Sequence, residues 1–181
     1  MRARFLGKDP NSKNPADYAA ATDLLMKARP YVKKFHSSEY IDALANGDVC
    51  VAIGYSGDVL QAKDRADEAK NGVRIAYAVP NEGSQVWFDV FAVPKDAPNA
   101  AAAHKFIAFM LRPEIIAKAS NATRYANPNT AATSLVDEDL RADPDVYLTP
   151  EVSKRLFVTT TKDQALLRDV NRQWTRVLTG R

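Results

Sequence analysis

Apolar runs of strand length constrain this chain more than any other feature of its sequence. Asp48–Gly54, "DVCVAIG", is apolar at nearly every position, which is typical of a strand covered on both faces of its sheet. "YSGD" (Tyr55–Asp58) then turns into a segment of helical pattern that reaches about Asn71, and Gly72 is the expected stop. Strand, glycine-containing turn and helix make a βα unit, and ligands of open α/β sheets bind beside turns of this kind.

Further strands and helices alternate along the chain. Val73–Val79, "VRIAYAV", is a second expected strand, and Ser84–Pro94, "SQVWFDVFAVP", is a third. Helices are expected over seven other segments: Tyr18–Ala28, Ser37–Asn46, Ala100–Leu111, Pro113–Ser120, Leu135–Arg141, Pro150–Phe157 and Asp163–Leu178. The pattern therefore predicts an α/β fold with a helical carboxyl-terminal tail.

Composition and motifs exclude several classes of function. The 181 residues are 46% hydrophobic and 26% charged, which suits one good core or two small ones. The net charge of +3 is spread along the sequence without a basic block interleaved with aromatics, so no nucleic-acid partner is expected. No P-loop, dinucleotide-binding motif, serine elbow or paired-histidine metal motif occurs, and no cofactor or metal is expected. The single Cys50 lies in an apolar run, where we expect a buried, inert thiol.

Asp89 is the one charged residue in the middle of the third expected strand. Side chains alternate across a strand, so Trp87 and Phe91 would flank Asp89 on its own face. An ionised carboxylate in such an apolar setting is costly unless it is paired. One interpretation is that backbone amides or an arginine pair with it. The other is that the partner is a ligand cation, with Trp87 supplying a π face.

Asp58 is a second candidate, because it lies in the first turn of the expected helix. A carboxylate there interacts favourably with the helix dipole, and this alone explains an aspartate at Asp58. Tyr55 follows the end of the first strand, where an aromatic side chain would face a ligand cleft. Tyr125 is a third aromatic, in the loop "RYANPN" beside Asn127. A pair of acidic residues is also compatible with a carboxylate-pair hydrolase.

Two long stretches resemble one family of proteins. They are "FHSSEYIDALANGDVCVAIGYSGDVLQAKDRADEAKNGVRIAYAVPNEGSQVWFDVFAVP" and "FIAFMLRPEIIAKASNATRYANPNTAA". They are similar to the periplasmic putrescine/spermidine-binding proteins of bacterial ABC importers, and the resemblance extends from "FLGKDPNS" to "RQWTRVLTGR". It implies a type II periplasmic-binding-protein fold, with two α/β lobes that close on a ligand about a hinge. It also implies a polyamine ligand, the membrane subunits of an importer as partners, a periplasmic location and no enzymatic activity.

The resemblance also implies the residues of the binding site. Asp58 and Asp89 match carboxylates that bind ammonium groups, whereas Tyr55, Trp87 and Tyr125 match aromatic walls. Relatives that prefer putrescine tend to carry Phe where this chain has Trp87, so the resemblance favours spermidine. Thr159, in "LFVTTT", corresponds to a further residue lining the pocket.

Family members are roughly twice as long as this chain, which resembles their carboxyl-terminal half. The resemblance then assigns residues 1–75 and 134–181 to the second lobe, and residues 76–133 to the hinge return and a remnant of the first lobe. Half a cleft leaves ammonium groups partly hydrated, so binding by this chain alone is expected to be impaired. Exposed sheet edges also make self-association possible, and an isolated lobe or domain-swapped fragment without polyamine binding remains an alternative.

Overall fold

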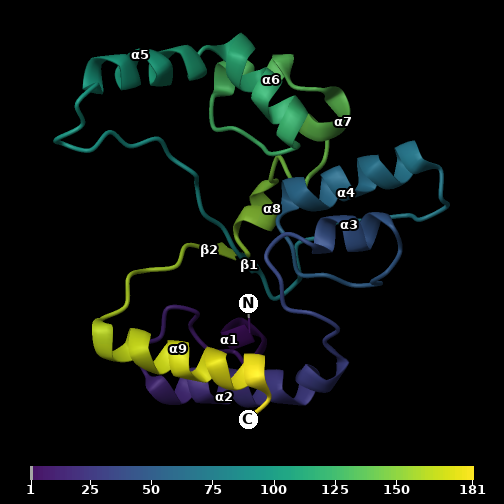
Figure 1. Cartoon of the computed structure of the whole chain (residues 1–181), viewed down its shortest axis with the longest axis vertical. Helices are drawn as coiled ribbons and strands as arrows, with labels where there is room; N and C mark the ends of the chain where they lie inside the picture. The colour runs from purple at the N-terminus through teal and green to yellow at the C-terminus, as the bar shows by residue number, and fades with distance from the viewer. Residues whose placement is uncertain (1) are drawn as a thin grey trace. The chain divides into compact units, whose positions relative to one another are not determined.

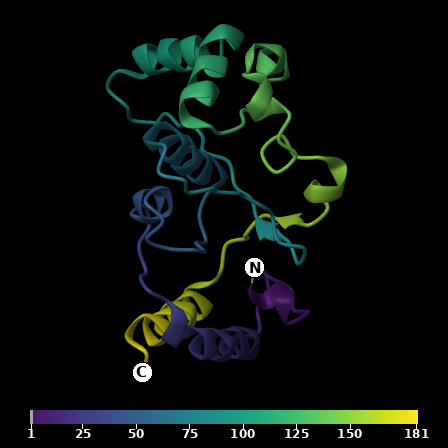
Figure 2. The same ribbon diagram turned by 90° about the vertical axis from the view of Figure 1, so that its right-hand side faces the viewer.

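The computed structural model describes residues 2–181, which form two compact units (Figures 1 and 2). The first unit takes in the chain up to Ser37, together with Val79–Trp87 and Ser153–Arg181. The second consists of Ser38–Ala78 and Phe88–Val152. Within residues 2–181, no helix combines the length and the apolar character that crossing a membrane requires.

The first unit is built around a pair of helices that lie side by side, α2 (Pro15–Ala28) and α9 (Gln164–Thr179) (Figure 1). Both begin at a side-chain cap, since Asn14 accepts the N–H of Ala16 and Asp163 accepts that of Leu166. Short helical turns occupy α1 (Arg2–Phe5) and η1 (Arg29–Tyr31). Arg29 of η1 donates to the carbonyl groups of Val177 and Leu178 at 3.0 and 3.2 Å, so it binds the free carbonyl end of α9.

A short parallel sheet completes the first unit. It pairs β1 (Ser84–Gln85) with β2 (Leu156–Phe157), and Ser84 lies opposite Leu156 in the register. The N–H of Val86 continues this pairing by donating to the carbonyl of Phe157 at 2.9 Å. The helix expected over Pro150–Phe157 is therefore wrong beyond Ser153, because the chain turns there into β2.

The second unit contains most of the helices. They are α3 (Tyr40–Ala45), α4 (Ser56–Ala69), α5 (Ala100–Met110), α6 (Pro113–Thr123), η2 (Thr130–Leu135), α7 (Glu138–Arg141) and the start of α8 (Pro150–Ser153). Helix α4 contributes to two buried clusters. Its Leu60 packs with Ala117, Val136 and Leu140, and its Val59 and Ala62 pack with Leu44 and Ala45 of α3. Because α4 is held on two sides, its first turn is fixed within the unit.

The two expected strands of this unit are not strands in the structure. Both segments, Asp48–Gly54 and Val73–Val79, pack some of their residues against the second cluster, among them Ala52 and Ile75. Val51 and Ile53, in contrast, are 86% and 78% exposed. The expectation of a segment covered on both faces is therefore wrong, because α3 and α4 cover one side and no described residue covers the other. Cys50 is exposed for the same reason, against the expectation of a buried thiol.

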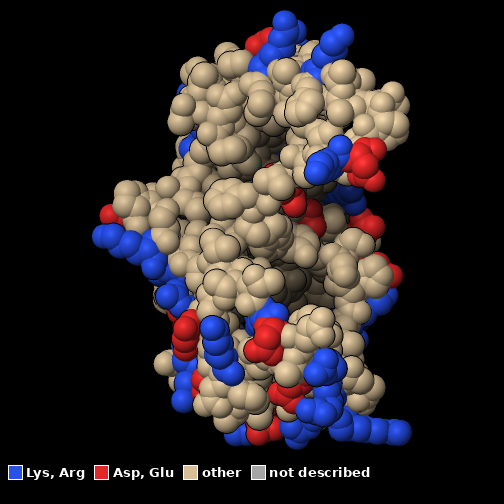
Figure 3. Space-filling model, turned by 90° about the vertical axis from the view of Figure 1, so that its left-hand side faces the viewer, with Lys and Arg blue, Asp and Glu red and all other residues tan. Residues whose placement is uncertain are grey.

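The third expected strand is equally short of partners. Only its first two residues form β1, and Phe88, Val90 and Phe91 beyond them are exposed, with Val90 at 79%. The segment is therefore not a buried strand, since no described strand pairs with it after Val86. Figure 3 shows a face of the molecule on which broad areas carry no Lys, Arg, Asp or Glu side chain. The lobe boundaries predicted from the resemblance stay a prediction, and the two compact units follow a different division.

Candidate ligand-binding site

The carboxylate of Asp58 lies between two tyrosine hydroxyls in the second unit. Tyr40 of α3 donates to Oδ2 of Asp58 at 2.6 Å, and Tyr125, which follows α6, donates to Oδ1 at 2.7 Å. Each carboxylate oxygen thus accepts one phenol hydrogen bond. Among residues 2–181, Asp58 forms no ion pair with a lysine, arginine or histidine. The expectation that Asp58 lies in the first turn of a helix is confirmed, since it is the third residue of α4.

Tyr40 also connects Asp58 to the start of α4. The N-cap residue Tyr55 has no side-chain cap, and its backbone N–H donates to the Tyr40 hydroxyl at 3.1 Å. In a capping box the third helical residue accepts the N-cap N–H directly. Here the hydroxyl of Tyr40 stands between the two, accepting from Tyr55 and donating to Asp58. Helix capping thus accounts for part of the geometry of Asp58, in addition to the interaction with the helix dipole that the sequence alternative expected.

Two glycines let the tyrosine rings approach the backbone closely. A Cβ atom on Gly54 would lie 2.9 Å from Cζ of Tyr40, and one on Gly57 would lie 2.6 Å from Cγ of Tyr125. Real Cβ atoms essentially never come so close to another heavy atom. The sequence "GYSG" therefore provides a seat for each ring, and these seats place both hydroxyls on Asp58.

Burial and the carboxylate keep both hydroxyls protonated. Burial is the larger cause of a raised pKa for Tyr40 and for Tyr125, and the hydrogen bond to Asp58 raises each pKa further. The two phenols therefore remain neutral donors far above neutral pH. Because neutral donors do not cancel a charge, the carboxylate keeps its capacity to attract a cation.

The backbone before Tyr125 is held by ion pairs. Arg124 ends α6 in the left-handed region at φ 62°, which is uncommon for a residue with a side chain. Its Nε lies 3.3 Å from Oδ2 of Asp64 on α4, and its Nη2 pairs with Asp139 on α7. The hydrogen bond from Arg124 lowers the pKa of Asp139 below its ordinary value. This anchored turn directs the next residue, Tyr125, toward Gly57 and Asp58.

Trp87 and Thr159 belong to the first unit. The register of the parallel sheet sets Gln85 against Phe157, and Trp87 and Thr159 each follow one of these partners by two residues. Asn11 binds the backbone on both sides of Thr159, because its amide donates to Val158 at 2.9 Å and accepts the N–H of Thr160 at 2.9 Å. Thr159 itself is exposed. The two predicted pocket residues of this unit thus follow its two strands at the same end of the sheet.

Asp89 lies in the second unit but is not part of the Asp58 cluster. Its side chain is exposed and makes no hydrogen bond or ion pair with any residue from 2 to 181. The segment around Asp89 is exposed, so its carboxylate does not lie in the apolar setting that would make an unpaired charge costly. The pairing with an arginine or with backbone amides that was considered from the sequence is not formed either. Its role as a ligand carboxylate therefore stays a prediction.

Three residues of this geometry were missed by the sequence analysis as site residues. Tyr40 was assigned only to the apolar face of its helix, and nothing in its spacing from Asp58 indicates a contact. Asn11 and Arg124 are also polar residues whose partners lie far along the sequence. Only the sequence "GYSG" carried a local signal, since two glycines around a helix start allow close approach of other groups.

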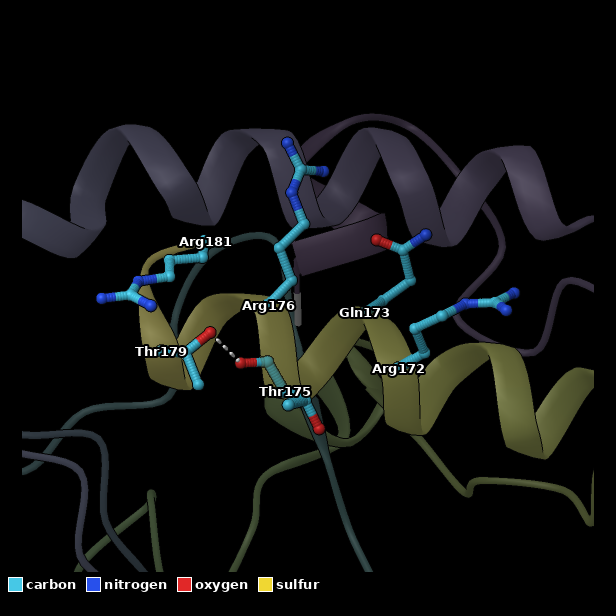
Figure 4. Close-up of a pocket in the computed structure, with 6 residues that line it drawn as sticks. All are labelled: Arg172, Gln173, Thr175, Arg176, Thr179 and Arg181. Carbon is cyan, nitrogen blue, oxygen red and sulfur yellow. Dashed lines mark hydrogen bonds between the residues drawn. The ribbon is translucent and has the colours of Figure 1, made fainter.

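A cavity in the described part of the chain lies away from Asp58. It has a volume of about 500 Å³ and is lined by residues of α9 and the terminus: Arg172, Gln173, Thr175, Arg176, Thr179 and Arg181 (Figure 4). Arg176 reaches toward α2, where it pairs with Asp23 at 2.9 Å. A depression lined by arginines and no carboxylate repels cations, so it is not the predicted site. Within residues 2–181, no three His, Cys, Asp or Glu side chains are grouped to hold a metal ion.

Comparisons with known proteins agree with the family indicated by the sequence. The model of the family described as "Bacterial extracellular solute-binding protein" matches residues 3–147. The putrescine-binding periplasmic protein PotF of Escherichia coli (strain K12) is 49% identical over 98% of this chain and 48% of its own length. The putrescine-binding periplasmic protein SpuD of Pseudomonas aeruginosa (strain UCBPP-PA14) is 46% identical over 98% of this chain and 48% of its own length.

A solved structure shows the same fold. The spermidine/putrescine ABC transporter substrate-binding protein PotD from Streptococcus pneumoniae (strain Canada MDR_19A), in complex with calcium and HEPES, superposes with a TM-score of 0.80 at 28% identity. The match covers 98% of this chain and 53% of that one, and the chain spans about half the length of the curated relatives it matches. These relatives are named as binding proteins and not as enzymes, which removes the ground for a hydrolase. The chain belongs to the bacterial extracellular solute-binding proteins.

Proposed function

We propose that this chain forms part of a polyamine-binding site that serves an ABC importer. The observation that carries the proposal is the carboxylate of Asp58, which is held by Tyr40 and Tyr125 and has no cationic partner among residues 2–181. A carboxylate has about four acceptor positions, and the two phenols occupy two of them. The rest are available to the N–H groups of an ammonium ion, while the ring of Tyr125 and the neighbouring Tyr55 offer aromatic surface to its methylene chain.

Family membership supports the ligand class and the location. PotF and SpuD are named putrescine-binding periplasmic proteins, and we transfer both the polyamine and the periplasm to this chain as proposals. The membrane subunits of an importer are the proposed partners. Asp89 is proposed as the carboxylate for the second ammonium group, and Trp87 with Thr159 as a further wall of the site. The common end of β1 and β2 from which Trp87 and Thr159 extend supports that pairing.

The preferred polyamine is a separate question. Trp87 favours spermidine, because a larger ring covers a longer methylene chain, and this preference is part of the proposal. The names of the relatives at 49% and 46% identity point to putrescine instead. A Trp87→Phe variant decides between them: the preference predicts that it gains affinity for putrescine relative to spermidine, and an unchanged ratio contradicts it.

The proposed site is incomplete in this chain. If the ammonium groups contact only these residues they remain partly hydrated, and a charge contact in water is several-fold weaker than one at an effective dielectric constant of about 20. We therefore propose weaker binding by this chain than by a full-length relative. The same proposal assigns residues 1–75 and 134–181 to the second lobe, and residues 76–133 to the hinge return and a remnant of the first lobe.

Self-association is the second proposed property. Val51 and Ile53 form one exposed apolar surface, and Phe88, Val90 and Phe91 form another. Large exposed apolar surfaces are uncommon in monomers and favour association. Native mass spectrometry at several concentrations tests it, and a monomer at every concentration refutes it.

Calorimetric titration of the 181-residue chain with putrescine and spermidine tests polyamine binding, with 1,4-butanediol as the uncharged control. We expect heat of binding from both amines and none from the diol. Asp58→Asn is expected to weaken binding at least tenfold, because it removes the charge and keeps the shape. Asp67→Asn, an exposed site on the same helix, is the matched control and is expected to leave affinity unchanged. Equal affinity of the Asp58→Asn and Asp67→Asn variants contradicts the proposal.

A further inference from the structure

Tyr40 holds the Asp58 carboxylate of the proposed site but is not itself proposed to contact the ligand. It is half-buried on α3, and its ring packs with the cluster formed by Leu44, Val59 and Ala62. The Tyr40 hydroxyl, in contrast, lies among polar groups. It makes two hydrogen bonds, one to the side chain of Asp58 and one from the backbone of Tyr55.

We infer that Tyr40 is a positioning residue of the ligand site, whose hydroxyl fixes the Asp58 carboxylate in its cation-binding orientation before any ligand arrives. This role rests on the proposed function, since it concerns the same carboxylate. Tyr40 does not touch the ligand itself. It acts through Asp58, by holding the oxygen atom that Tyr125 does not hold.

The direction of the Tyr40 hydrogen bonds is determined by chemistry. A backbone N–H can only donate, so the bond from Tyr55 at 3.1 Å makes the Tyr40 hydroxyl an acceptor there. An ionised carboxylate can only accept, so the single hydroxyl proton lies on the bond to Asp58. The hydroxyl therefore cannot rotate away without losing both bonds, and the carboxylate has one rigid donor on this side.

The second donor gives the carboxylate a fixed plane. Tyr125 holds the other oxygen at 2.7 Å, so neither oxygen can turn without breaking a hydrogen bond. The Gly54 and Gly57 seats limit the movement of the two rings themselves. A side chain that is already ordered loses less conformational entropy on binding, and this is the physical benefit of Tyr40 to affinity.

The neutral state of the phenol makes this arrangement suited to a cation. A lysine or arginine in the place of Tyr40 would orient the carboxylate equally well, but it would also cancel its charge and compete with the ligand. Because the pKa of Tyr40 is raised by burial and by Asp58, the hydroxyl stays protonated and adds no negative charge of its own. The carboxylate is thus oriented and remains charged.

Helix capping is the competing explanation for Tyr40. A purely structural cap predicts that removing the hydroxyl lowers the stability of α4 and leaves the affinity of the folded protein unchanged. A positioning role predicts weaker binding by protein that is fully folded. The two explanations therefore differ in the dissociation constant measured well below the melting temperature.

The experiment compares Tyr40→Phe with Tyr31→Phe, a control at a tyrosine that is 89% exposed. Both variants of the 181-residue chain are titrated with putrescine and spermidine below their melting temperatures. We expect Tyr40→Phe to raise the dissociation constant roughly three- to tenfold for both amines, because the carboxylate must then be ordered on binding. Tyr31→Phe is expected to leave the dissociation constant unchanged.

A spectroscopic readout reports directly whether the amine joins Asp58. An ammonium group that joins Asp58 changes the surroundings of both phenols, so amine binding should perturb tyrosine absorption in the ultraviolet. This difference spectrum is expected to shrink in Tyr40→Phe and to persist in Tyr31→Phe. If Tyr40→Phe does not fold, Gly54→Ala replaces it, because a methyl group there displaces the Tyr40 ring and keeps its hydroxyl. The same loss of affinity is expected.

Each outcome has a distinct meaning. Binding of amines by the parent chain with an unchanged dissociation constant in Tyr40→Phe overturns the positioning role and leaves the proposed function standing. An absence of amine binding by the parent chain overturns both. A reduced melting temperature with unchanged affinity assigns Tyr40 to helix capping alone, which also overturns the role.

Discussion

Gly57→Ala is the substitution whose effect follows most directly from the geometry of the site. The new Cβ atom would lie 2.6 Å from Cγ of Tyr125, whereas ordinary van der Waals contacts begin at 3.4 Å. The ring must therefore move by about 1 Å, or the clash must be tolerated. Moving the ring lengthens its 2.7 Å hydrogen bond to Asp58 beyond the range in which such bonds are effective.

The magnitude follows from opposing contributions to the free energy of unfolding. A retained clash costs about 1–3 kcal/mol, and a lost hydrogen bond to a charged group costs about 1.5–3 kcal/mol. Only one of these costs applies, because a ring that moves relieves the clash but loses the hydrogen bond, and a ring that stays keeps both. Alanine is favoured over glycine in a helix by up to about 1 kcal/mol, which offsets part of the loss. We expect Gly57→Ala to lower the free energy of unfolding by about 1–2 kcal/mol.

Urea denaturation followed by circular dichroism measures this change, and a double-mutant cycle identifies its cause. In a Tyr125→Ala background the obstructing ring is absent, so Gly57→Ala should become neutral or stabilise by up to about 1 kcal/mol. Gly57→Ala should thus destabilise the parent chain but not the Tyr125→Ala variant. If Gly57→Ala stabilises the parent chain as much as it stabilises the Tyr125→Ala variant, the seat for the ring does not exist and the reasoning fails.

Three further predictions concern other parts of the chain. Asn11→Ala removes both bonds to the backbone around Thr159, and we expect a loss of roughly 1–2 kcal/mol in the free energy of unfolding together with faster amide exchange there, whereas unchanged exchange contradicts it. The raised pKa values of Tyr40 and Tyr125 keep both protons on the folded chain above pH 10.0, where the unfolded chain loses them. The free energy of unfolding should therefore be constant below that pH and fall above it, and urea midpoints that stay constant through it would refute the burial of these phenols. Exposed Cys50 should react with a thiol reagent in the native chain at a rate close to that in urea, and protection in the native chain argues against its exposure.

The positions of most helices were predictable from the sequence because their hydrogen bonds lie within one segment. Pro113 and Asp163 each lie where a helix begins, and Asp58 lies in a first turn as expected, whereas α2 begins at Pro15, before the expected start at Tyr18. These signals are local, and a distant partner changes them little.

Strands were not predictable in the same way, because a strand exists only with a partner. Val73–Val79 has the β-branched and aromatic residues of a strand, yet no described segment pairs with it in a ladder. The burial expected for Cys50 and Asp89 depended on those same missing layers. The apolar pattern thus identified which residues favour a sheet. Whether a sheet forms depends on a partner segment that the pattern of one segment does not reveal.

Contacts of the site were beyond sequence reasoning for a related reason. Tyr125 is 67 residues from Asp58, and Tyr40 is 18 residues from it, so neither contact follows from a helical or strand period. The sequence pattern and the resemblance to a family supplied Asp58 and Tyr125 as separate candidates. They did not indicate that a second phenol holds the other oxygen, since Tyr40 fits the apolar pattern of its own helix.

The two proposed carboxylates differ in how much order a ligand must create. Asp58 is held by two hydrogen bonds on a helix that is packed on two sides, whereas Asp89 lies on an exposed segment with no ladder partner among residues 2–181. Binding at Asp58 therefore requires little ordering, while binding at Asp89 must also order the backbone, at about 1–2 kcal/mol per residue. A diamine that reaches both carboxylates should consequently gain most of its affinity from the Asp58 end. The ordered carboxylate then acts as the anchor, and the second contact adds affinity only as far as other parts of the protein hold the segment of Asp89 in place.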